Sequence, residues 1–392
     1  MITTKKVLVL GGGFAGVEAS IYLKKNKNIE VTMVSDRDYF YIYPTSIWIP
    51  TGGTTKEQIS VPLDQLAVKH GFQVIVDAVE VLDAEAKKVT LASGRILEGY
   101  DYIVVALGQD KMGAKGIENT LSICGKPEEA VELHKRLEAL VEKGSGKIAM
   151  GFGGNPKDSS AVRGGPAFEV LFNVNTFLKR KGIRDKFELT FFAPMEKPGQ
   201  KMGPKALVMM DKMFGMTNIN KKVGSKITSF EADGVNFEDG TKLESDLIMF
   251  ISAGKGHSVL EASTLPLTDA GFVVTNEFNE VEGFEGIYAI GDSASLMGPE
   301  WRAKQGHVAE IMAKNVANNI AVNINGGKRE SYMEHLNILC VMDTGDGAAF
   351  VYRDDNGGKM IPMPFVGHWM KRGWGWYCRN SKLGKIPRLP GM

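Results

Sequence analysis

Residues 5–24 read KKVLVLGGGFAGVEASIYLK, and this stretch decides the fold. Its VLVL run is typical of a buried parallel strand, and its last eight residues have the pattern of a helix. The glycines between them have the spacing Gly-x-Gly-x-x-Gly. Gly11 permits a tight turn, Gly13 lets the backbone approach a pyrophosphate, and Gly16 allows the helix to pack closely on the strand. Since the helix N-terminus also offers N–H donors to phosphates, the stretch predicts a dinucleotide-binding unit.

A second apolar run follows at Ile29–Val34 and predicts the neighbouring strand. It ends in Ser35 and Asp36, about 20 residues beyond the last motif glycine, where a ribose-binding residue is expected. A glycine-rich turn without a ligand is the alternative. The strand, the helix and the polar residue together favour the dinucleotide.

Composition narrows the class of protein. The chain has 392 residues, which predicts two to three domains, and 47 Lys and Arg balance 46 Asp and Glu. This balance excludes a disordered chain and a nucleic-acid partner held by overall charge. Three cysteines and six histidines show neither a disulfide framework nor metal-ligand spacing. We expect no signal peptide, because the first strand starts at once, and no transmembrane helix, because no apolar run reaches 18 residues.

Two later segments indicate which dinucleotide binds. Tyr100–Gly108 predicts a buried strand that runs into a small-residue turn, and Gly286–Asp292 predicts a strand that ends in Gly-Asp before a helix at about 305–320. With the first motif, these segments resemble the three FAD signatures of the two-dinucleotide-binding-domain flavoproteins. The resemblance implies that Asp292 holds the ribityl or phosphate part of FAD. It also implies that the following helix points its N-terminus at the flavin N1–C2=O edge, where reduction adds negative charge.

The same resemblance implies an inserted second domain, which in members that use pyridine nucleotides carries its own glycine motif. Here the corresponding segment, 147–158, reads KIAMGFGGNPKD. The first two glycines of the motif are present as Gly151-x-Gly153. Asn155-Pro156 then interrupts the turn, and the helix is expected only from about Gly165. Because the insertion moves the helix N-terminus away from a pyrophosphate, the segment argues against NADH as a substrate.

Further motifs resemble sulfide:quinone oxidoreductase and the flavoprotein subunit of flavocytochrome c sulfide dehydrogenase over essentially the whole chain. These motifs are Val31–Asp36, Tyr39-Phe40, Pro44–Ser46, Ser122-Ile123-Cys124, Gly165–Glu169, Lys304-Gln305-Gly306, Ile338–Asp343 and Lys385–Gly391. The resemblance implies that Cys340, Lys304 and Glu169 are catalytic. It implies an FAD site formed by Gly11, Gly13, Phe14, Ala15, Gly16, Ser35, Asp36, Pro44, Val79, Ala106, Gly108, Gly291, Asp292, Lys304 and Gly306.

The sequence departs from that family at one of two redox cysteines. The first should precede the Gly-Pro-Ala-Tyr-Glu motif, but Val162 and Arg163 stand there. Sulfide is then oxidised with Cys340 alone, or Cys124 stands in for the missing cysteine, or the substrate differs. A sulfur-handling Cys340 has to ionise, and we expect the charge of Lys304 and the helix N-terminus to lower its pKa. Without the resemblance, Cys340 reads as a buried structural cysteine.

Lys304 also has two interpretations. A lysine near a helix start is normally solvated, and a helix N-terminus is an unfavourable place for a cation. An anionic reduced flavin would neutralise it, and we prefer this second interpretation.

The C-terminal segment predicts a membrane contact. From Lys359 onward the chain has seven Lys or Arg and no Asp or Glu. Aromatic and apolar residues recur every three to four positions, at Phe365, Trp369, Met370, Trp374 and Tyr377. A basic amphipathic helix with aromatic residues is typical of a segment that lies in the membrane plane. A helix docked on the protein's own core is the alternative.

We therefore predict an α/β protein with two Rossmann-like domains. Its FAD domain comprises residues 1–112 and 255–325, the inserted domain 113–254, and a C-terminal active-site and membrane segment 326–392. We expect a peripheral enzyme of the cell inner membrane that oxidises a reduced sulfur species and passes electrons through FAD to quinone. The sequence does not indicate on which face of the membrane it lies. No nucleic acid or metal is expected, and a homo-oligomer is left open. The alternatives are a type II NADH:quinone oxidoreductase, a flavoprotein subunit that reduces a cytochrome, and a degenerate flavin-binding interaction protein.

Overall fold

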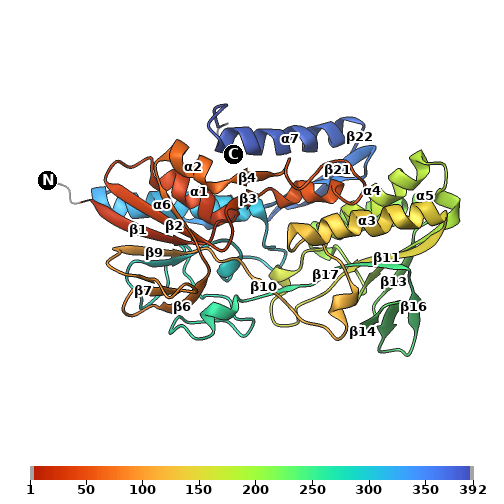
Figure 1. Ribbon diagram of the computed structural model, residues 1–392, viewed down its shortest axis with the longest axis horizontal. Coiled ribbons are helices and arrows are strands. Elements are labelled where there is room, and N and C mark those ends of the chain that lie inside the picture. Colours follow the sequence, from red (N-terminus) through yellow and green to blue (C-terminus); the bar gives the residue numbers. More distant parts are fainter. Residues whose placement is uncertain (1–3, 389–392) are drawn as a thin grey trace.

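The computed structural model describes residues 4–388 and forms two α/β units with a C-terminal sheet and helix (Figure 1). The last four residues of the predicted membrane segment, 389–392, lie outside the described residues, as do residues 1–3.

The first unit is built on a sheet of five parallel strands in the order β19-β9-β1-β2-β5. These strands are β1 (Lys5–Leu10), β2 (Ile29–Ser35), β5 (Gln73–Val76), β9 (Tyr102–Val105) and β19 (Ile287–Ala289). Two helices, α1 (Phe14–Leu23) and α6 (Gly306–Asn325), pack against each other beside the sheet. Numbered along the chain, the strand order is that of a doubly wound dinucleotide-binding fold. Its ligand crevice is expected where the order reverses, at the carboxyl ends of β1 and β9.

The second unit has its own parallel sheet, in the order β13-β12-β11-β17. Its elements are α3 (Pro127–Lys143), β11 (Gly146–Phe152), α4 (Gly165–Arg180), β12 (Phe187–Ala193), α5 (Pro204–Thr217), β13 (Asn220–Val223) and β17 (Leu247–Ile251). Both sheets consist mostly of fully buried apolar residues, as expected for parallel sheets covered on both faces. The predicted α/β class with Rossmann-like sheets is confirmed, while the domain boundaries given above stay a prediction.

Short strands and 3₁₀ helices connect these sheets. The strands are β3 (Tyr39–Tyr41), β4 (Ser60–Pro62), β6 (Val79–Asp83), β7 (Lys88–Leu91), β8 (Ile96–Leu97), β10 (Asp110–Lys111), β14 (Ile227–Glu231), β15 (Gly234–Phe237), β16 (Lys242–Glu244) and β18 (Gly254–Lys255). The helices are α2 (Leu63–His70), η1 (Tyr43–Trp48), η2 (Ile117–Asn119), η3 (Ser159–Ala161), η4 (Arg184–Lys186), η5 (Gln200–Met202), η6 (Ser258–Leu260), η7 (Gly291–Ser293) and η8 (Tyr332–His335).

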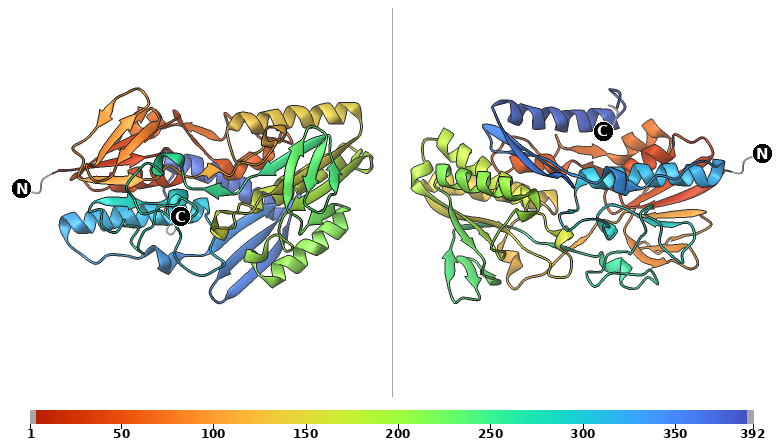
Figure 2. Two further views of the ribbon diagram at one scale, coloured as in Figure 1. Left: turned by 90° about the horizontal axis from the view of Figure 1, so that it is seen from below. Right: turned by 180° about the vertical axis from the view of Figure 1, so that it is seen from behind.

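The C-terminal part is an antiparallel sheet followed by one long helix. The strands β20 (Ile338–Asp343), β21 (Gly347–Asp354) and β22 (Gly357–Pro364) lead into α7 (Val366–Lys382). Figures 1 and 2 show α7 lying along one outer face of the molecule, with its far end over the first unit. Within residues 4–388, no helix has both the length and the apolar character needed to cross a membrane.

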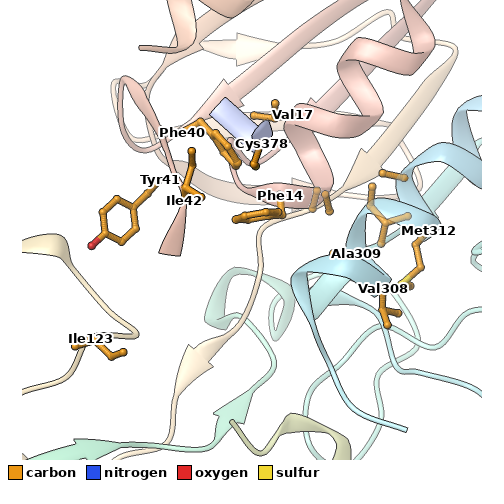
Figure 3. Packing of buried hydrophobic residues seen from close by; sticks show 14 of the residues in the cluster. Phe14, Val17, Phe40, Tyr41, Ile42, Ile123, Val308, Ala309, Met312 and Cys378 are labelled. Atoms are coloured by element: carbon orange, nitrogen blue, oxygen red, sulfur yellow. The ribbon is translucent and has the colours of Figure 1, made fainter. Parts of the chain in front are cut away.

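The inner face of α7 docks on the protein core. Cys378 is buried and lies beside Phe40 and Val17 of the first unit (Figure 3). One turn later, the Lys382 Nζ lies 2.7 Å from Glu18 Oε2 and 2.6 Å from Glu310 Oε1. The docked helix that the sequence left as an alternative is therefore correct for this face of α7.

Candidate active site and cofactor cleft

The first glycine motif forms the predicted tight turn between β1 and α1. Gly11 has a φ of +120°, and a Cβ there would collide with the carbonyl oxygen of Ala106, which directly follows β9. A Cβ on Gly16 would collide with the carbonyl oxygen of Gly11. By contrast, a Cβ on Gly13 would meet no heavy atom within 4 Å. The outer two glycines are thus required by protein packing, whereas the middle one borders open space of the kind a pyrophosphate needs.

The other predicted cofactor residues differ in their contacts and in their burial. Gly291 lies against Ala15 of α1, and the Ser293 hydroxyl accepts the backbone N–H of Gly108 at 2.8 Å. Ser35 is buried and Asp36 is exposed at the end of β2, while Val79 is only half-buried at the start of β6.

One cavity of about 800 Å³ opens beside the motif and extends between the two units to α7. It is lined by the three predicted catalytic residues, Glu169, Lys304 and Cys340, and by three other predicted FAD residues, Phe14, Pro44 and Gly306. The side-chain oxygen Oε1 of Gln305, which also lines it, is buried without a hydrogen-bond partner in the described chain. The volume and this unpaired acceptor fit the isoalloxazine end of a bound FAD.

Lys304 lies in the wall of this cavity, immediately before α6. It is 5% exposed, so it is not a solvated surface lysine. Its Nζ donates to the carbonyl oxygens of Asp292, at 3.1 Å, and Ala294, and it lies over the ring of Phe272. Burial lowers the pKa of Lys304 to about 7. A negative charge arriving in the cavity would therefore favour the protonated form of Lys304.

Glu169 is the centre of a buried cluster at the other end of the cavity. It extends from α4 and is 3% exposed, and both its carboxylate oxygens accept the Lys371 Nζ of α7 at 2.6 Å. Its Oε1 also lies 3.3 Å from the backbone N–H of Asp343 and 4.0 Å from the Cys340 Sγ. Burial raises the pKa of Glu169 to about 7 against the opposing charge of Lys371.

Cys340 therefore has surroundings different from those expected. Burial, followed by the negative charge of Glu169, raises the pKa of the Cys340 thiol to about 12. The expectation that Lys304 and a helix N-terminus lower this pKa is wrong, because a carboxylate contacts the sulfur and burial opposes its ionisation.

The other two cysteines differ in their relation to the main cavity, which Cys378 lines as Cys340 does. Cys124 does not line the main cavity in the described chain, and burial raises its pKa although Arg163 opposes the shift. Cys378 is packed in the core beneath α7, and burial raises its pKa to about 12. The three cysteines are all free.

Arg163 occupies the place where the resemblance puts the first redox cysteine. Its guanidinium forms an ion pair with Asp292 and lies 5.6 Å from the centre of the Tyr43 ring. Arg163 thus lines the cavity with a fixed positive charge in place of a nucleophilic sulfur.

Sequence reasoning missed the partners that α7 supplies to this site. Besides Lys371, His368 bonds through Nδ1 to the fully buried Asp343 at 2.7 Å, and Asp343 also accepts the Trp48 indole N–H at 3.1 Å. Lys371 and His368 face the same side of α7, three residues apart. This spacing in the sequence could have indicated that both side chains enter the site. The same spacing is equally typical of the polar side of a surface helix.

The interrupted second glycine motif has the predicted form. After β11, the buried Asn155 donates from Nδ2 to the Gly254 carbonyl at 2.8 Å and accepts the backbone N–H of Lys157 at 2.9 Å. α4 begins only at Gly165. A side chain of the protein therefore fills the turn that would have to admit a second pyrophosphate.

Comparison with known proteins identifies the family. A signature described as "Pyridine nucleotide-disulphide oxidoreductase" matches residues 5–315. The chain belongs to this family. The predictions of an oxidoreductase and of FAD as its cofactor are thereby confirmed.

Individual relatives agree with the resemblance seen in the sequence. The chain is 29% identical to the sulfide-quinone reductase of Aquifex aeolicus over 374 residues, which cover 89% of this chain and 84% of that protein. The X-ray structure of the sulfide:quinone oxidoreductase from Aquifex aeolicus superimposes with a TM-score of 0.86 and 27% identity, covering 97% of this chain and 92% of that one. A type II NADH:quinone oxidoreductase of Staphylococcus saprophyticus is 24% identical over 387 residues, 91% of this chain and 92% of that protein.

Proposed function

We propose that this protein is a membrane-associated, FAD-dependent sulfide:quinone oxidoreductase that works with one redox cysteine. The observation that carries the proposal is the contact of Cys340, Glu169 and Lys371 in one buried cluster on the wall of the main cavity. The similarity to a sulfide-quinone reductase supports the same substrate class. The filled second glycine turn makes the NADH alternative weaker.

The protein supplies a cradle for FAD in which Gly13 would leave room for the pyrophosphate and protonated Lys304 would offset the negative charge of the reduced cofactor. Bound FAD supplies two-electron transfer between a sulfur donor and quinone. Because burial lowers the pKa of Lys304 to about 7, a negative charge that develops within the same cavity would draw Lys304 into its protonated form.

The donor side requires a nucleophilic sulfur and a base. In our proposal, hydrosulfide and the Cys340 thiol become a persulfide on Cys340, two electrons go to the cofactor, and one proton is released. Glu169 receives this proton, because its Oε1 is the carboxylate oxygen in contact with the Sγ. A base is needed because the thiol itself is held protonated.

We predict that Cys340→Ser retains bound FAD but loses reduction of the flavin by sulfide by about 100-fold or more, because the acceptor sulfur is gone. Stopped-flow absorbance of the bound flavin measures this rate. Cys124→Ser and Cys378→Ser are the matched controls and should reduce near the wild-type rate, since neither sulfur contacts Glu169. Reduction of Cys340→Ser by sulfide at the wild-type rate, or of the wild type by NADH alone, would refute the sulfur assignment.

The quinone side is proposed to lie beneath α7. Lys371, Trp374 and Tyr377 line the main cavity from this helix. The aromatic side chains of Trp374 and Tyr377 suit a flat apolar ring. A quinone that is dissolved in a membrane would reach this end of the cavity if α7 lay on the membrane surface.

The outer face of α7 has the character that such contact needs. Phe365 is 75% exposed, Trp369 71% and Trp376 61%, with Val366 and Met370 beside them. These residues form an apolar surface that continues along one side of the helix. The apolar set predicted from spacing was partly wrong, because Trp374 and Tyr377 line the cavity instead.

We predict that Trp369→Ser together with Trp376→Ser weakens binding to phospholipid vesicles by about tenfold or more, because two large apolar side chains no longer enter the lipid. Vesicle co-sedimentation measures the partition. Both side chains point away from the cavity, so flavin reduction by sulfide should not change. Undiminished binding of this variant would exclude α7 as the membrane contact.

Deleting the C-terminal segment is not a clean test of the same proposal. The buried Glu18 is bound by Lys382 and by Arg388, whose charges lower its pKa although burial opposes the shift. Removal of both cations would leave a buried carboxylate unpaired and destabilise the first unit. We therefore expect the deletion also to impair flavin reduction, which depends on a folded first unit.

A further inference from the structure

A second cavity, of about 330 Å³, lies where α1, α2 and α7 end beside one another. We call it the α7-end cavity; its lining residues are Ile21, Lys24, Lys25, Lys69, His70, Ser381, Gly384, Ile386 and Arg388. Five of these residues are basic and none is Asp or Glu. The lining is therefore positive wherever it is charged.

Two of the basic residues have partners that satisfy them. Arg388 Nη2 donates to Glu18 Oε2 at 3.0 Å. The His70 Nε2 lies 2.6 Å from the Lys382 carbonyl oxygen, and burial lowers the pKa of His70, so its ring is a neutral donor near pH 7. These residues shape the cavity but add little free charge.

The three lysines carry the uncompensated charge. Within residues 4–388, none of them has a carboxylate within ion-pair distance. The Lys24 Nζ donates to the Ile29 carbonyl at 2.9 Å, and the Lys25 Nζ lies 3.7 Å from the centre of the Tyr22 ring. Neither contact neutralises an ammonium. Burial, followed by the nearby charge of Arg388, lowers the pKa of Lys25 although the charge of Glu18 opposes the shift, and a bound anion would favour the charged form of Lys25.

The cavity lies next to the surface that we assign to the membrane. The end of α7 contacts α2 through His70, as noted, and Figure 1 shows α2 close to this end of α7. On α2, Val68 is 87% exposed immediately before Lys69. A basic hollow at the end of a helix that lies in the membrane plane is at the level of the lipid phosphates.

We propose that the α7-end cavity binds the phosphate of an anionic phospholipid headgroup, and that this contact fixes the C-terminal segment over the main cavity. Ser381 and Arg388 line both cavities, so a headgroup held in one would order residues that close the other. The proposal rests on the membrane association proposed above but adds a saturable, headgroup-specific site to it.

The test compares two triple variants of equal charge change. Lys24→Gln/Lys25→Gln/Lys69→Gln removes the free charge of the cavity, and Lys115→Gln/Lys186→Gln/Lys226→Gln removes three exposed lysines of the inserted unit. Co-sedimentation is measured with vesicles of phosphatidylcholine alone and with phosphatidylglycerol added. We expect the cavity variant to lose about tenfold or more of the preference for phosphatidylglycerol, and the control variant to keep it.

A second measurement, the ligand-dependent change in Tm, shows whether the cavity variant is folded. It also distinguishes a lipid headgroup from free inorganic phosphate. Wild-type protein should show a saturable rise in Tm with short-chain phosphatidylglycerol below its micelle concentration, and the cavity variant should not. An equal rise with inorganic phosphate would overturn the lipid assignment in favour of a free anion. An unchanged lipid preference in the cavity variant would also overturn it. Neither result would affect the membrane role of α7, which the Trp369/Trp376 variant tests separately.

Discussion

Replacing Gly13 by valine is expected to give a folded but colourless protein. A Cβ at this position meets no protein atom within 4 Å, so the side chain has room in the absence of a ligand. The same space is where the backbone must approach the pyrophosphate, and a branched side chain would occupy it. We expect FAD affinity to fall by at least about 100-fold, measured by the flavin absorbance of purified protein and by titration of the apoprotein with FAD.

Gly16→Val serves as the contrasting variant. Its Cβ would collide with the Gly11 carbonyl oxygen, so it should lower the free energy of unfolding of the apoprotein itself. Circular dichroism of both apoproteins separates the two effects. A yellow Gly13→Val protein with the wild-type FAD content would mean that the pyrophosphate does not lie at this turn.

Lys371→Met is expected to lower the free energy of unfolding by about 3–5 kcal/mol, because it leaves the Glu169 carboxylate buried without its partner. The ion-paired side chains of Lys371 and Glu169 are only 7% and 4% exposed, so solvent screens the interaction little. The double variant Glu169→Gln/Lys371→Met should recover more than half of the loss, since no buried charge remains. Urea denaturation of the three variants and the wild type gives the complete cycle.

The pH dependence of this loss follows from the raised pKa of Glu169. Its pKa of about 7 in the folded protein is above that of an unfolded glutamate, so the folded state binds this proton more tightly. The contribution of this proton to the free energy of unfolding is fully present below the pKa of an unfolded glutamate. It is lost as the pH rises through about 7, the pKa of Glu169 in the folded protein. Without Lys371 the pKa rises further, so the deficit of Lys371→Met should be larger at pH 8 than at pH 5. A deficit that is independent of pH would contradict a titrating Glu169.

The variant Glu169→Gln of this mutant cycle also tests whether Glu169 takes part in the reaction, because a purely structural ion pair would not change the chemical step. Glu169→Gln should slow flavin reduction by sulfide by roughly 100-fold, because the base that takes the Cys340 proton is lost. It should also remove from the pH profile the part that belongs to the titration of Glu169. A Glu169→Gln variant that is less stable yet reduces at the wild-type rate would leave Glu169 as a structural residue only.

Much of the fold could be predicted because its signals are local. The strand, turn and helix at residues 5–24 follow from apolar periodicity, from the positive φ of Gly11, and from the contact of Gly16 with Gly11 five positions earlier. The late start of α4 followed from Asn155-Pro156 for the same reason. The family and the cofactor could be predicted from the sequence, because the motifs that indicate them are short strand–turn–helix segments.

The chemistry of the site could not be predicted in the same way. Cys340 looked like a candidate thiolate, and only the tertiary structure places the Glu169 carboxylate, 171 positions earlier in the chain, against its sulfur. Lys371 binds that carboxylate from 202 positions away, and Arg388 binds Glu18 from 370 positions away. The sequence by itself determined the strand, turn and helix of the first glycine motif, because backbone conformation and the Gly16–Gly11 contact depend on residues close together in the chain. Only the tertiary structure decided which groups are charged, because burial and distant partners set a pKa.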